Sequence, residues 1–149
     1  MSAVLQANAP GAPADQLATR CIGPVFHPYA WVFRPGRMSG THFLTPSALD
    51  LQVGVLERAR GERVQAHTHV VQSRTLHSSS ELLYVEHGRV LVDVYDEDWQ
   101  LLADEMLSRG EMLLLLRGGH ALTVIDDARV IEVRQGPYAG VDKRFRDDA

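Results

Sequence analysis

The chain has 149 residues, a hydrophobic share of 45%, a charged share of 23% and a formal net charge of −4. This composition is typical of an ordinary globular protein with one domain and a sizeable core. Positive and negative residues are interspersed, which argues against nucleic acid as a partner, and no apolar run reaches the roughly 20 residues of a membrane helix.

The N-terminal segment, residues 1–18, is rich in Ala and contains Pro and Gly, so we expect it to be mobile, with one weak helical turn around 14–19. It has neither the basic start nor the apolar stretch of a signal peptide. Cys21 is the single cysteine, which excludes an internal disulfide and fits a reducing compartment. We therefore expect a cytoplasmic protein with no membrane segment.

The next segment, Cys21 to Met38, is aromatic, and its three prolines favour short edge strands over a helix. From residue 51 onward, the chain consists of short segments in which apolar and polar residues alternate, and turn residues separate these segments every 8 to 12 positions. Short strands with turns at this spacing are typical of an all-β sandwich or barrel. The predicted strands are 51–57, 63–71, 81–85, 89–95, 99–107, 112–116, 120–125 and 129–135. Turns are predicted between them, among others at His87-Gly88 and at Asp126-Asp127.

Two histidines one residue apart, His67 and His69, are the most informative feature of the sequence. Side chains alternate along a strand, so both imidazoles are expected to point to the same face. The carboxylate of Glu81 and the imidazole of His120, from neighbouring strands, would complete a metal site with open coordination positions.

The spacing of these residues follows a pattern, Gly61-x5-His67-x-His69 and then Glu81-x6-Gly88, followed by Gly110 and His120. Residues near 50 to 135 thereby resemble the cupin superfamily. The resemblance implies a single-domain jelly-roll barrel over residues 19–149. It also implies four ligands for one divalent ion (Fe, Mn, Ni, Co or Zn): His67, His69, Glu81 and His120.

The sequence departs from the family pattern at two places. The segment between His69 and Glu81 is longer than usual, and the second motif has Leu116 where the family has Pro. The stretch 131–138 is similar to a branch of small bacterial cupins that often accompany sugar or polysaccharide biosynthesis.

Further residues are candidates for ligand contact. Glu132 and Arg134 share one strand face, so they point either into the barrel mouth or into a cross-strand ion pair. Arg74 and His77 lie in the long segment and form either a lid or a solvated loop. Tyr138 follows Gly-Pro and either packs that turn or reaches the ligand.

Three functions are compatible with these residues. The first is a metal-dependent enzyme, of oxygenase, isomerase or lyase type, acting on a small organic or sugar-like molecule. The second is a metal-free sugar-nucleotide epimerase or isomerase in which His69 or His120 acts as a base beside Tyr138. The third is a non-catalytic module that binds a metal or small ligand. A homodimer is expected, because the aromatic N-terminal segment provides edge strands for pairing.

Overall fold

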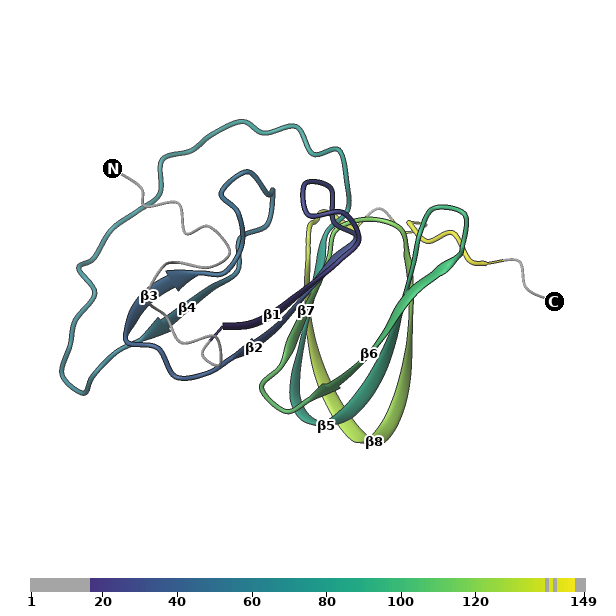
Figure 1. Cartoon of the computed structure of the whole chain (residues 1–149). Helices are drawn as coiled ribbons and strands as arrows, with labels where there is room; N and C mark the ends of the chain where they lie inside the picture. Colours follow the sequence, from purple (N-terminus) through teal and green to yellow (C-terminus); the bar gives the residue numbers. More distant parts are fainter. Residues whose placement is uncertain (1–16, 139, 141, 147–149) are drawn as a thin grey trace. The chain divides into compact units, whose positions relative to one another are not determined.

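The computed structural model describes residues 17–138, 140 and 142–146 (Figure 1). The described residues form strands and contain no helix, so the predicted all-β class is confirmed. None of them forms a helix long and apolar enough to span a bilayer. The expected mobility of residues 1–18 and the helical turn around 14–19 fall mostly outside the described part. Where they overlap it, the helical turn is wrong, because residues 17–19 belong to strand β1 (Leu17–Ile22). The strands are β1 (Leu17–Ile22), β2 (Ala30–Pro35), β3 (Gly40–Phe43), β4 (Gly54–Glu57), β5 (Glu81–Tyr95), β6 (Leu101–Ser108), β7 (Met112–Leu115) and β8 (Gly119–Arg134).

The described chain divides into two compact units. The smaller unit covers Pro35–His77 and contains the antiparallel pair β3–β4, in register from Gly40 opposite Glu57 to Phe43 opposite Gly54. The larger unit covers Thr19–Arg34 and the chain from Ser78 onward, and it contains the six-stranded sheet.

The six-stranded sheet is built around β5. Its strand order is β1-β2-β7-β5-β6, and β8 pairs with β5 as well. The first part of β5 pairs with β7 and its second half with β6, whereas β8 accompanies β5 along its whole length. These pairings are antiparallel, and the sheet curls into a half-barrel, with β5 and β8 bending together (Figure 1). This curled antiparallel sheet is compatible with a jelly-roll fold.

The bend in the β5–β8 pair corrects two turn predictions. Gly88 has φ +79°, a backbone angle that favours glycine, and the register shifts on both sides of it. A Cβ at Gly88 would clash with the carbonyl oxygen of Asp127 on the facing strand. His87-Gly88 and Asp126-Asp127 therefore face each other within one bent ladder, and the predicted strand pairs 81–85/89–95 and 120–125/129–135 are two long strands.

The core lies on the inner face of the curled sheet. Alternation on β5 directs Val90, Val92 and Val94 to this face, where all three are fully buried. The apolar cluster is completed by residues from the other strands. Its members are Ile22, Ala30, Val32, Leu83, Val85, Val90, Val92, Val94, Ala103, Leu107, Leu113 and Leu115.

The expectation of an edge strand in the aromatic segment is wrong for β2. This strand lies between β1 and β7 in the sheet, and its residues from Ala30 to Phe33 are all buried. The prolines do not prevent this position, because Pro28 precedes the strand and Pro35 ends it.

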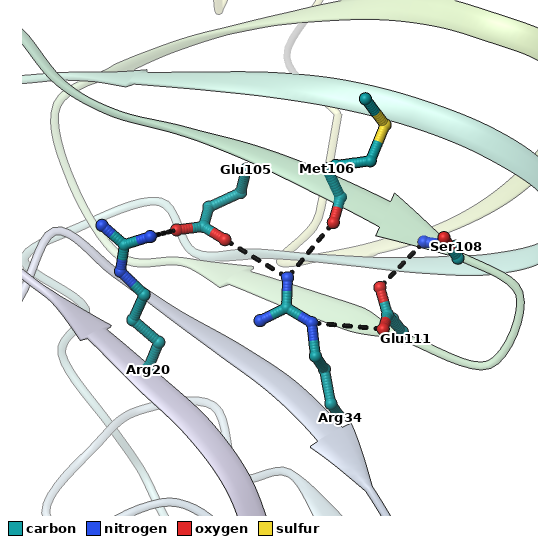
Figure 2. A network of polar contacts seen from close by, with 6 residues as sticks. All are labelled: Arg20, Arg34, Glu105, Met106, Ser108 and Glu111. Atoms are coloured by element: carbon teal, nitrogen blue, oxygen red, sulfur yellow. Dashed lines mark hydrogen bonds and ion pairs between the residues drawn. The ribbon is translucent and has the colours of Figure 1, made fainter.

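Figure 2 shows an ionic network of arginine and glutamate side chains. The network lies on the face of the sheet that carries the apolar core, because Glu105 alternates on β6 with the core residues Ala103 and Leu107. Glu105 on β6 is opposite the core residue Val92, and its side chain is only 5% exposed. It forms ion pairs with Arg20 on β1 and with Arg34 on β2, the latter at 3.3 Å between Nη2 and Oε2. Arg34 Nε also lies 3.1 Å from Glu111 Oε1, and Arg34 Nη2 donates to the carbonyl oxygen of Met106 at 3.1 Å. The network links β1 and β2 to β6 and to the turn that follows it.

The predicted strand at 63–71 is absent. Residues 58–79 contain no strand, and each of them is exposed. The predicted turn forms at the start of this segment, with Glu62 N donating to the carbonyl oxygen of Ala59 at 3.1 Å. The described residues of the smaller unit pair in one ladder, β3–β4, and residues 63–71 take no part in it.

Candidate functional site at the mouth of the half-barrel

A pocket of about 830 Å³ lies in the larger unit, where the ends of the bent β5–β8 pair come together. One wall contains the start of β5 and the end of β8, including Glu81 and Arg134. The other contains the end of β5 and the start of β8, including Tyr95 and His120, and residues 142–146 contribute as well. The volume is in the range of about 300–1,000 Å³ that is typical of small-molecule sites.

Glu81 and His120 meet in this pocket. Glu81 is two residues before the core residue Leu83, and His120 is directly opposite the core residue Val94, so both side chains point to the inner face. The curl of the sheet brings His120 Nε2 to 3.4 Å from Glu81 Oε2. Two donor atoms at about 2.1 Å from one tetrahedral ion are about 3.4 Å apart, so this pair has the separation of two ligands of one metal ion.

Arg134 lies beside this pair. It is opposite Glu81 in the ladder, with 3.8 Å between Arg134 Nη1 and Glu81 Oε1, and its Nε is 3.7 Å from Glu132 Oε1. Its Nη2 is 3.1 Å from Asp142 Oδ2, and its guanidinium lies 5.1 Å from the centre of the Tyr138 ring. Arg134 thus lines the mouth and forms a cross-strand ion pair at the same time, whereas Glu132 is nearly half exposed.

The other predicted ligands and contacts belong to the smaller unit. His67 and His69 lie in the exposed segment without strand structure, with their ring centres 5.2 Å apart, and His67 Nδ1 is 2.8 Å from the carbonyl oxygen of Gln65. Arg74 and His77 lie in the same segment and are exposed. Within the described part of the chain, no three His, Cys, Asp or Glu side chains form a group that could hold a metal ion. The meeting of all four predicted ligands stays a prediction, because the two pairs belong to different units.

A cluster of three side chains at the edge of the pocket is not indicated by any sequence pattern. Tyr29 donates a hydrogen bond to Glu97 Oε2 at 2.6 Å, and Arg117 Nη1 donates to Glu97 Oε1 at 2.7 Å. The Arg117 guanidinium also stacks 3.5 Å above the centre of the Tyr29 ring. The hydrogen bond to Glu97 raises the pKa of Tyr29, and the same bond lowers the pKa of Glu97. The cluster fixes the loop between β5 and β6 against the start of β2.

Trp99 and the C-terminal residues of the pocket are likewise not indicated by any sequence pattern. Trp99 lines the pocket with a positive φ of 62°, and its ring lies so close to Gly119 that a Cβ there would clash with it. Lys143 and Arg144 line the same pocket. The Gly118-Gly119 pair indicates that another group packs closely against the backbone there, but no sequence pattern indicates that this group is the Trp99 ring.

Comparisons with known proteins add no family to this description. No family model matches the chain, no curated protein matches it, and no solved structure matches it. The structural class is therefore that of the fold itself, an all-β chain with a curled antiparallel half-barrel and a pocket at its mouth.

Proposed function

We propose that this chain is a cupin-type barrel protein that binds one divalent ion and a small organic or sugar-like molecule at its mouth, and that it acts as a metal-dependent enzyme. The proposed ligands of the ion are His67, His69, Glu81 and His120. The observation that carries the proposal is the 3.4 Å separation of Glu81 Oε2 and His120 Nε2 inside a pocket of about 830 Å³.

The donor set suits this role. Three imidazole nitrogens and one carboxylate are borderline ligands that bind Fe, Mn, Ni, Co or Zn, and one carboxylate leaves residual positive charge on a divalent ion. A bound ion would supply Lewis acidity toward an oxygen of the substrate. Arg134, 3.8 Å from the free side of Glu81, would orient that carboxylate and add positive charge beside the substrate.

The test is the metal content of the protein after reconstitution with each divalent ion and removal of the excess. We expect about one ion per chain in the wild type and a loss of bound ion in His67→Ala, His69→Ala, Glu81→Gln and His120→Ala. His87→Ala is the matched control, because His87 is exposed at the bend and does not line the pocket. Wild-type metal content in all four ligand variants would refute the proposal.

The same pair of residues also favours a second function. His120 beside the Glu81 carboxylate has the arrangement of a general base oriented by an acidic partner, as in a metal-free epimerase or isomerase. Tyr138, the phenol expected to assist it, hydrogen-bonds instead to the carbonyl oxygen of Gly140 at 2.5 Å. Thermal stabilisation by sugar nucleotides that is unchanged by a chelator would favour this function, and stabilisation that the chelator abolishes would favour the metal site.

A further inference from the structure

We infer that the pocket binds a small molecule with two features. The first is an anionic group, a carboxylate or a phosphate, which Lys143 and Arg144 bind. The second is a ring with an apolar face, which packs against Trp99. The inference deepens the proposed function and rests on its claim that the mouth binds a small molecule. It is derived from the charges and the aromatic rings of the larger unit, and not from a bound metal.

The acidic side chains that line the pocket already form ion pairs or hydrogen bonds with other groups of the protein. Glu81 and Asp142 form ion pairs with Arg134, and Glu97 pairs with Arg117. The fourth, Asp96, accepts backbone hydrogen bonds from Asp98 and Gln100 with its carboxylate, at 2.9 and 2.8 Å. The acidic side chains that line the pocket therefore have their interactions satisfied locally.

Two cationic side chains that line the same pocket have no such partner among the described residues. Lys143 and Arg144 line it, are exposed, and form no ion pair with any residue between 17 and 146 that the structure describes. Their positive charge is therefore available to a ligand. An ammonium and a guanidinium next to each other suit the oxygens of a carboxylate or a phosphate, which they bind by charge-assisted hydrogen bonds.

Trp99 provides the complementary apolar surface. Its positive φ of 62° is the left-handed position of the hairpin turn between β5 and β6, in which Trp99 N donates to the carbonyl oxygen of Asp96 at 3.2 Å, so the backbone that carries the ring is fixed. The ring packs against Gly119 on one side, and its centre is 6.0 Å from that of Tyr95. A ring held in this way presents a fixed apolar face to the ring of a ligand.

The test uses the fluorescence of the full-length protein. The chain has two tryptophans, of which Trp31 is buried and Trp99 lines the pocket, so a signal that is lost in Trp99→Phe reports on the mouth. The probes are glucose 1-phosphate, glucuronate, citrate and glucose, which separate phosphate from carboxylate and an anionic ring from an anion without a ring. We expect glucose 1-phosphate or glucuronate to bind with at least about 10-fold higher affinity than glucose, and citrate to change the Trp99 signal less.

The variant Lys143→Ala/Arg144→Ala is expected to lose about 10-fold in affinity for the anionic sugar and to keep its affinity for glucose. Arg60→Ala/Arg109→Ala removes the same charge from exposed positions outside the pocket and is expected to bind as the wild type does. Equal affinities for the charged and neutral sugars, binding of neither, or an unchanged affinity in the Lys143/Arg144 variant would overturn the inference. Metal content measured on the same samples tests the proposed function separately, because Lys143 and Arg144 are not among its ligands.

Discussion

Replacement of Glu105 by Gln tests the ionic network on the inner face of the half-barrel. The Glu105 side chain is 5% exposed and its partner Arg34 is 32% exposed, so the substitution leaves a partly buried guanidinium with only one of its two carboxylate partners. Removing one partner of a buried ion pair costs about 3–5 kcal/mol. Arg34 keeps Glu111 Oε1 at 3.1 Å and the carbonyl oxygen of Met106 at 3.1 Å, which reduces this cost. Arg20, 58% exposed, is solvated by water and adds little.

We therefore expect Glu105→Gln to lower the free energy of unfolding by about 2–3 kcal/mol, which is below the range for a fully buried pair because Arg34 keeps its other partners. The assay is urea unfolding followed by tryptophan fluorescence and circular dichroism, with an unchanged denaturant slope. Asp126→Asn is the matched control, because it removes a carboxylate from the exposed pair with Arg89, where both side chains are about half exposed. Its expected cost is much smaller than that of Glu105→Gln, because water screens an exposed ion pair. Equal losses in the two variants would refute the reasoning that burial makes the Glu105 network important.

Three further predictions concern the bend and the edge of the pocket. Gly88→Ala should lower the free energy of unfolding in urea by more than about 2 kcal/mol, because the new Cβ would meet both an unfavourable positive φ and a clash with the facing strand. Gly110→Ala is the control: its φ is +85° but no atom lies near the new Cβ, so it should lower the free energy of unfolding by about 1 kcal/mol. Similar losses in the two variants would contradict the clash at Gly88. The pKa of Glu97 is below its ordinary value of 4.5, so the ionised carboxylate stabilises the fold above that pH, and this stabilisation is lost as the pH falls through the lowered pKa. Glu97→Gln should therefore flatten the acidic part of a plot of the urea midpoint against pH. An unchanged acidic part would speak against the hydrogen bond to Glu97. The pKa of Tyr29 is raised above its ordinary value of 10.0, so the protonated phenol stabilises the fold below that pH, and this stabilisation is lost as the pH rises through the raised pKa. Tyr29→Phe should therefore remove the loss of stability at alkaline pH. The same loss in Tyr29→Phe as in the wild type would contradict this role of the phenol.

Much of the larger unit follows from local sequence patterns. The alternation along residues 89–95 predicts that Val90, Val92 and Val94 share one face of a strand, and all three form part of the core. Ser108 to Glu111 was predicted as a turn, and Glu111 N donates to the carbonyl oxygen of Ser108 at 3.0 Å. Gly88 shows the limit, because a preference for positive φ does not distinguish a turn that ends a strand from a bulge that bends it. The facing strand decides between them, and it comes about 40 residues later in the chain.

The site was predictable where it depends on strands and not where it depends on loops. Glu81 and His120 were expected on neighbouring strands, and the curled sheet brings them within 3.4 Å. His67 and His69 were expected on a strand that does not form, since local alternation cannot supply the ladder partner that a strand needs. Lys143 and Arg144 reach the pocket only because the chain returns to it after β8, and no periodic pattern encodes that return.

The central proposal is that His67, His69, Glu81 and His120 bind one divalent ion. X-ray absorption spectroscopy of tag-free, metal-loaded protein tests it directly, because imidazole ligands give a characteristic scattering pattern around the metal. We predict nitrogen and oxygen ligands at about 2.0–2.2 Å and an imidazole contribution that decreases in both His67→Ala and His120→Ala. A bound ion with no imidazole contribution, or one that is unchanged in either variant, would contradict the account.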